Sequence, residues 1–123
     1  MSKYQNRKVT VEGITFDSKK EANRYRELLL LERAGAITEL KRQVRFQLLP
    51  PVYDEYERYS DKTGKRLKNG RRCVEKGVVY VADFTYRQGL AKVVEDVKGH
   101  RTKEYILKRK MMRYFYGIEL KEI

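Results

Sequence analysis

The stretch VVYVADFTYRQGLAKVVEDVKG, residues 78 to 99, constrains the fold more than any other part of the chain. It reads as two apolar strands joined by a tight turn, for which Gln88-Gly89 is the candidate. Asp83 lies in the middle of the first strand, and several charged residues end the second. Aspartate is disfavoured in strands, and a charge on a half-buried sheet costs free energy unless another group pairs with it. A hairpin of this kind is expected to hold its acids against a cation or a basic partner.

Side chains alternate between the two faces of a strand, so the parity of the residue numbers sorts these charges. Asp96 and Lys98 share one face of the second strand, whereas Glu95 points the other way and is expected to be exposed or ion-paired. The turn sets the alignment of the two strands. A turn at Gln88-Gly89 pairs Arg87 with Leu90, which puts Asp83 on the same face as Asp96.

In this register Asp83 lies opposite Val94 and diagonal to Asp96. Diagonal neighbours are about 7 to 8 Å apart at the backbone, close enough for two carboxylates to share one ion. Such carboxylates repel each other unless a proton or a cation neutralises them. Oxygen ligands suit a hard divalent ion, Mg²⁺ or Mn²⁺ ahead of zinc.

Two acids, a divalent ion and a lysine together suit phosphodiester hydrolysis. Lys98 lies on the same face as Asp96 and can reach the same site, where it would orient the attacking water or stabilise charge in the transition state. The alternative is a solvated sheet face, on which Asp83 and Asp96 are exposed and Lys98 is a surface ion-pair partner.

The rest of the chain divides into elements with clear boundary signals. We expect a hairpin at 8–16, a helix at 18–35, a strand at 36–51, the two strands of the acidic hairpin, a helix at 101–117 and a strand at 118–123. This order indicates one α+β domain over residues 1–123. Thr102 is expected to cap the second helix, whose apolar face is expected at Leu107, Met111, Tyr114 and Phe115. The segment at about 54–73 is polar and basic, and reads as an inserted loop or hairpin tip.

The charge balance points to a polyanionic partner. The chain has 29 Lys and Arg against 17 Asp and Glu, a formal net charge of +12, and nucleic acid is the expected partner of so basic a domain. A basic but inert surface is the alternative. The single cysteine, Cys73, fits a reducing compartment. Neither a signal peptide nor an apolar run of membrane-spanning length is present, so we expect a cytoplasmic protein without a membrane partner.

Asp83 followed by Asp96-Val97-Lys98 across a hairpin resembles the PD-(D/E)XK nuclease superfamily. The segments FDSKKEANRY, YVADFTY and VVEDVKG more closely resemble a small phage-encoded family of unknown function within it, which is similar to Holliday-junction resolvases. The resemblance implies a restriction-endonuclease-like αβββαβ core, a mixed central sheet flanked by helices, over about residues 18–123. Ala82 replaces the proline of the motif, which removes no ligand.

The resemblance also implies the roles of the site residues. Asp83, Asp96 and the Val97 carbonyl would bind Mg²⁺ or Mn²⁺, and Lys98 would act on the attacking water. An acid of the first helix falls on Glu21 and would complete the site, through water or directly. A phage protein would work in the cytoplasm of its host, and a junction-resolving enzyme with one site per chain would be a homodimer.

Glu21 has a second interpretation, because Ser18-Lys19-Lys20-Glu21 matches a capping box in which glutamate is structural. If Asp17 caps the helix instead, Glu21 is free to face the site. We favour the site. Gln43, in the strand after the helix, could approach the same site behind the metal ligands.

The expected DNA contacts are basic residues outside the acidic hairpin: Lys62, Lys65, Arg66, Lys68, Arg71, Arg72, His100 and Lys103. For most of them a solvated, mobile position is the alternative. The sequence therefore predicts a divalent-metal-dependent DNA endonuclease, with branched DNA such as a Holliday junction as one candidate substrate. The alternative is a non-catalytic basic nucleic-acid-binding protein of phage replication or packaging.

Overall fold

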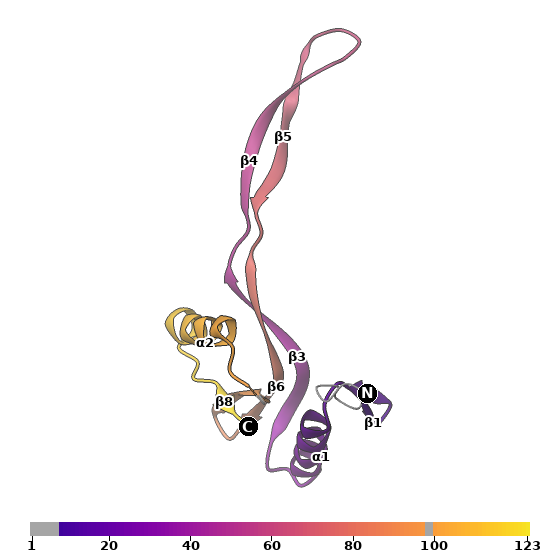
Figure 1. Cartoon of the computed structure of the whole chain (residues 1–123), viewed down its shortest axis with the longest axis vertical. Coiled ribbons are helices and arrows are strands. Elements are labelled where there is room, and N and C mark those ends of the chain that lie inside the picture. Colours follow the sequence, from indigo (N-terminus) through magenta and orange to yellow (C-terminus); the bar gives the residue numbers. More distant parts are fainter. Residues whose placement is uncertain (1–7, 98–99) are drawn as a thin grey trace.

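The computed structural model describes residues 8–97 and 100–123 (Figure 1). Its elements are β1 (Val9–Val11), β2 (Ile14–Phe16), α1 (Lys19–Arg33), β3 (Thr38–Leu49), β4 (Val52–Tyr59), β5 (Arg66–Glu75), β6 (Val78–Gln88), β7 (Ala91–Asp96), α2 (Lys103–Tyr116) and β8 (Lys121–Glu122). The central sheet has the order β3-β6-β7-β8. β8 runs parallel to β7, whereas the other neighbours are antiparallel, so the sheet is mixed. The α+β class, the N-terminal hairpin and the αβββαβ order are thus confirmed.

Local sequence signals account for the first elements. Glu12 and Gly13 take φ values of +51° and +78°, as the two central residues of a tight hairpin turn require, and the strands pair from Val11 to Ile14 outward. Ser18 caps α1 by accepting a hydrogen bond from the Glu21 N–H at 3.1 Å. The helix ends before Gly35, which adopts the left-handed conformation.

Two hydrophobic clusters hold the helices against the sheet. α1 contributes Ala22 and Leu28 to one cluster, which also contains Phe84 and Tyr86 of β6. α2 contributes Tyr105 and Met112 to the other, together with these residues of the sheet and the C-terminal segment: Phe46, Leu48, Tyr80, Ala82, Val94 and Leu120. β6 therefore packs on α1 through one end and on α2 through the other.

The buried face of α2 differs in part from the expected one. Met111 packs against the core as expected, together with Tyr105 and Met112, whereas Leu107, Tyr114 and Phe115 are 58%, 82% and 50% exposed. The expected residues and the buried residues both have helical spacing. The second half of this helix is apolar on most sides, so periodicity alone could not show which side is buried. Thr102 caps the start of the helix as expected, and Gly117, at φ +66°, caps its end. Within residues 8–97 and 100–123, neither helix is long and apolar enough to cross a bilayer.

The β6–β7 turn also differs from the expected one. Gln88 pairs with Ala91, so the two turn residues are Gly89 and Leu90 rather than Gln88 and Gly89. Gly89 has φ +63° and occupies the first turn position, where a type II′ turn favours glycine. Glycine in the second position would have left Gln88 in the left-handed region, and this steric cost explains the two-residue shift in register.

A two-stranded arm leaves the central sheet at the ends of β3 and β6 (Figure 1). It consists of β4 and β5, and resolves the basic insertion into a long hairpin whose tip is residues 60–65. Leu49 pairs with Val78 on the sheet side of the arm's base, and Val52 pairs with Glu75 on the arm side. The two pairs have the same register, so the arm continues the alignment of β3 with β6. The ladder is interrupted at the base by Pro50 and Pro51, because proline has no N–H to donate.

Candidate active site

The acidic residues gather where β3 and β6 change the face that they present to the helices. Residues 80 and 82 of β6 pack in the α2 cluster, whereas 84 and 86 pack in the α1 cluster. Residues of equal parity share a face in a regular strand, so the backbone must rotate between Ala82 and Phe84. β3 changes face at the paired position, because Leu40 packs with α1 and Val44 with α2. Gln43 and Asp83 lie at this change of face.

Gln43 connects two acids from different elements. Its backbone has φ +51°, which is rare for a residue other than glycine, and its side-chain amide reaches both α1 and β6. The Nε2 group lies 3.3 Å from Glu21 Oε1 and 3.5 Å from Asp83 Oδ1. The second contact is at the limit of a hydrogen bond. The predicted approach of Gln43 to the acids is therefore observed.

Glu21 serves the helix cap with its backbone and the acidic cluster with its side chain. The N–H binds Ser18 Oγ, while the carboxylate faces Gln43 and lies 4.0 Å from the Arg42 guanidinium. Burial raises the pKa of Glu21, and the charge of Asp83 raises it further, against the opposing effect of Arg42. Glu21 and Asp83 are thus close enough to repel each other. Ser18 is therefore the N-cap, but the contacts of the Glu21 carboxylate are with Gln43 and Arg42 and not with the Ser18 N–H that a capping-box glutamate would bind.

The Asp83 carboxylate is also held from the β7 side. Its Oδ2 accepts a hydrogen bond from the Val97 N–H at 2.7 Å. The register of β6 and β7, extended one position beyond Phe84–Glu95, brings Asp83 level with Asp96 rather than diagonal to it. Val97 therefore reaches the cluster through its N–H, and the role of its carbonyl as a metal ligand stays a prediction.

Asp96 is more deeply buried than the other two acids. Its side chain is 1% exposed and accepts a hydrogen bond from the Tyr80 hydroxyl at 2.5 Å. Burial is the main cause of the raised pKa of Tyr80. The hydrogen bond to Asp96 raises this pKa further, and the charge of Asp83 adds a weaker effect in the same direction. Tyr80 therefore holds Asp96 by a direct hydrogen bond and senses the charge of Asp83. Sequence parity misses Tyr80, because the change of face at residue 83 places an even-numbered residue beside these acids.

Glu95 is ion-paired, which was one of its two expected states. It is completely buried, and its carboxylate receives the Arg24 Nε and Nη2 groups at 2.8 and 2.6 Å. The Tyr86 hydroxyl donates to the same carboxylate, and burial beside Glu95 raises the pKa of this phenol to about 12. Arg24 lies one helical turn after Glu21. This pair fixes the start of α1 against β7.

The predicted DNA contacts lie in two places, on the arm and at the start of α2. Lys62 and Lys65 lie in the tip of the arm, and Arg66, Lys68, Arg71 and Arg72 on β5. His100 and Lys103 are exposed at the start of α2. Lys98, the predicted residue for water activation, lies outside the described residues.

The described side chains do not form a ready-made cage for a metal ion. Among residues 8–97 and 100–123, no three Asp, Glu, His or Cys side chains converge on one point. Two carboxylates, Glu21 and Asp83, do approach each other without being fully buried. Mg²⁺ in proteins is commonly held by one or two carboxylates plus water and substrate phosphate. The donor set therefore fits an ion that is completed by its substrate.

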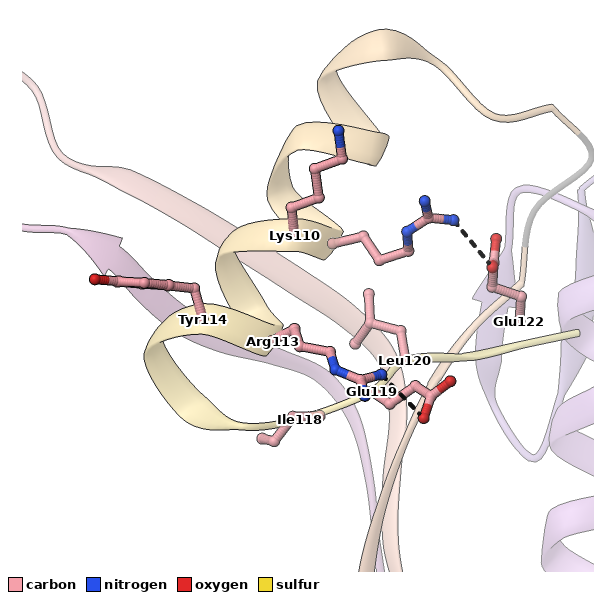
Figure 2. Close-up of a pocket in the computed structure, with 8 residues that line it drawn as sticks. Lys110, Arg113, Tyr114, Ile118, Glu119, Leu120 and Glu122 are labelled. Atoms are coloured by element: carbon pink, nitrogen blue, oxygen red, sulfur yellow. Dashed lines mark hydrogen bonds and ion pairs between the residues drawn. The ribbon is translucent and has the colours of Figure 1, made fainter.

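A pocket of about 490 Å³ lies elsewhere, between α2 and the segment that leads to β8 (Figure 2). Most of its charges are matched, because Arg113 pairs with Glu119 at 3.1 Å and Arg109 with Glu122 at 3.5 Å, and Lys110 is the remaining charged residue of its lining. None of the predicted site residues that the structure describes lines it. The acidic cluster, rather than this pocket, is the candidate site.

Comparison with known proteins gives one match. A family model described as "Protein of unknown function (DUF1064)" matches residues 1–122. No curated protein and no solved structure is significantly similar to the chain.

Proposed function

The chain belongs to this DUF1064 family, and we propose that it is a divalent-metal-dependent DNA endonuclease of the PD-(D/E)XK type. The observation that carries the proposal is the approach of Glu21 and Asp83, from a helix and a strand, around the strained residue Gln43. Two carboxylates that repel each other are a natural place for a cation. The net charge of +12 supports a polyanionic substrate.

The chain's own groups have distinct tasks in this proposal. Asp83 and Glu21 would hold Mg²⁺ or Mn²⁺, and the Gln43 amide and the Val97 N–H would keep these carboxylates in place. A bound divalent ion supplies charge neutralisation at phosphate and acidifies water. Asp96, held by Tyr80, would support the site or bind the ion directly. Lys98 would orient the attacking water, a role that rests on its spacing from Asp96 in the sequence.

Cleavage of supercoiled plasmid and of a synthetic four-way junction tests this proposal. We expect the wild-type protein to cut in Mg²⁺ or Mn²⁺ and to be inactive in EDTA. Asp83→Asn should lower the rate by at least about 100-fold, while DNA binding in EDTA is kept or tightened because a charge near phosphate is removed. Glu119→Gln, at an exposed carboxylate between α2 and β8, is the matched control and should cut normally.

Two results would contradict the proposal. Wild-type protein that binds DNA but cuts neither substrate would favour the non-catalytic binding protein. Asp83→Asn that cuts at the wild-type rate would remove the acidic cluster from the chemistry. Symmetric cutting of the junction would further require two copies of the chain, which light scattering on the DNA complex would detect.

A further inference from the structure

The arm formed by β4 and β5 lacks the partner that a two-stranded ribbon needs. Every residue of β4 is exposed, and among the strands of residues 8–97 and 100–123 β4 and β5 pair only with each other. An isolated two-stranded hairpin is marginally stable in water, and a third strand or a packed layer normally supports it. The arm therefore exposes a surface that another molecule can cover.

The charge of the arm indicates what that molecule is. Between Arg58 and Arg72 the sequence has seven Lys or Arg residues and one acid, Asp61. Among the described residues, none of the seven forms an ion pair with a carboxylate, whereas several bases outside the arm do, Arg24 and Arg87 among them. The other acids of the arm are Asp54, Glu55 and Glu57 on β4 and Glu75 at the end of β5, and Asp54 and Glu55 lie opposite Arg72 and Arg71 in the ladder. Two copies of so basic a region would repel each other, so a polyanion fits better than a second chain.

The positive charge lies on both faces of the ribbon. Arg71 lies 4.0 Å from the ring centre of Tyr53, and Arg72 lies 5.7 Å from that of Tyr56. Neighbouring residues of a strand point to opposite faces, so these two stacked guanidinium groups face opposite ways. A β-carbon on Gly70 would collide with the Tyr56 ring, which therefore lies across this glycine. Both arginines are thus held in place by tyrosines rather than left free.

These features lead to one inference, which rests on the proposed function and adds the class of its substrate. We propose that the arm inserts into a groove of duplex DNA about one helical turn away from the site of cleavage, so that the substrate is double-stranded on that side. The major groove of B-form DNA is about 12 Å wide and admits a two-stranded β-ribbon. A ribbon that enters edge-on turns its two faces toward the two walls of phosphate, where arginines on both faces fit. β5 has 10 residues, a length of about 33 Å at roughly 3.3 Å per residue. That is close to the pitch of about 34 Å of the double helix.

Binding of a labelled 30-base-pair duplex in EDTA, followed by fluorescence anisotropy at several salt concentrations, tests this. Arg71→Ala and Arg72→Ala should each weaken duplex binding by about 5- to 10-fold, and the double variant should lower the salt slope by about 1.8, since each phosphate contact contributes about 0.9. Binding of a single strand of equal length should change less. The matched control is Arg26→Ala/Arg33→Ala on α1, which should bind as wild type. Hydroxyl-radical footprints should shorten by about one turn in the arm variant.

Three outcomes would overturn the inference: wild-type affinity and salt slope in the double variant, an effect of only one arginine (contact through a single face), or loss of self-association instead of DNA binding. Because the assay contains no metal, it is independent of cleavage. If the arm variants lose DNA binding but the wild-type protein never cuts DNA, the proposed endonuclease activity is refuted and the proposed DNA contact of the arm is supported. If the wild-type protein cuts DNA and the arm variants bind DNA normally, only the proposed DNA contact of the arm is refuted.

Discussion

Gln43 shows how one residue can store strain at a site. A non-glycine residue at φ +51° costs roughly 1 to 3 kcal/mol and persists only where its surroundings hold it there. Its surroundings are Glu21 and Asp83, which both lie within reach of its amide. Glutamine is a poor choice for the backbone at this position and a good one for holding two carboxylates.

We therefore predict that Gln43→Gly separates stability from activity. Glycine accepts φ +51° without strain, so the free energy of unfolding in urea should hold or rise by up to about 1 kcal/mol. Cleavage should fall at least about 10-fold, because the amide is lost. Glu39→Gly is the matched control: Glu39 has φ +56° on the same strand, but its carboxylate faces only the exposed Arg87. This control should be stabilised by a similar amount and cut normally; equal activity of both variants would show that Gln43 is structural.

The raised pKa of Glu21 gives a prediction with a defined sign. Because burial and Asp83 raise this pKa in the folded state above its ordinary value of 4.5, folding is favoured while Glu21 is protonated, and that contribution is lost as the pH rises through the raised pKa. Glu21→Gln should therefore be more stable than wild type at pH 7 and equal to it below about pH 4. Glutamine leaves the backbone cap with Ser18 intact.

Thermal melting of this variant at several pH values, with and without Mg²⁺, checks the prediction. Mg²⁺ should raise the melting temperature of wild type more than that of Glu21→Gln, since binding to the folded state stabilises it. A variant that melts lower than wild type at pH 7 would mean that the Glu21 side chain supports the helix.

At the scale of elements, the buried pair of Arg24 and Glu95 sets the position of α1. Glu95 is completely buried and Arg24 side chain is 15% exposed, so each charge depends on the other. Parity correctly places Glu95 on the face opposite Asp96, and from this position alone a mild effect of its substitution would be expected. Because Glu95 is buried against α1, we instead expect its substitution to lower the stability of the fold strongly.

We predict that Glu95→Gln lowers the free energy of unfolding by about 3 kcal/mol, because it leaves the Arg24 charge poorly compensated. Glu27→Gln is the control, since Glu27 contacts the same arginine at 2.8 Å but is 63% exposed. It should change stability by no more than about 0.5 kcal/mol. Urea denaturation of the two variants makes the comparison, and similar small losses in both would contradict the structural role of Glu95.

At the scale of the whole molecule, the arm and the core are nearly independent. Leu49 and Val78 are paired at the base of the arm, so an Asn-Gly turn in place of residues 50–77 can join them directly. We predict that this shortened chain melts within a few degrees of wild type, because β4 buries no residue against the core. Its duplex binding should fall more than that of the Arg71→Ala/Arg72→Ala variant. Circular dichroism would check the fold, and a loss of cooperative melting would show that the arm belongs to the core.

Much of this architecture follows from local sequence alone. The Glu12-Gly13 turn, the Ser18 and Thr102 caps and the glycines that follow the helices all act within a few residues, so their effect does not depend on the rest of the chain. The hairpin pattern also places Asp83 and Asp96 on neighbouring strands, and parity places Glu95 on the face opposite Asp96. Because parity survives a two-residue shift, the wrong turn changed the alignment of these acids but not their faces.

Tertiary structure decided the features that depend on competition between distant groups. The apolar residues of α2 offered two stripes, and only the shape of the sheet selected Tyr105 and Met112 for burial. The rotation of β3 and β6 at Gln43 and Asp83 arises because each strand must pack on α2 at one end and on α1 at the other. The alternation of residues within one strand cannot indicate where that strand changes from packing on α2 to packing on α1. The sequence by itself determined which residues could form a site, and the packing of two helices on one sheet determined where their side chains meet.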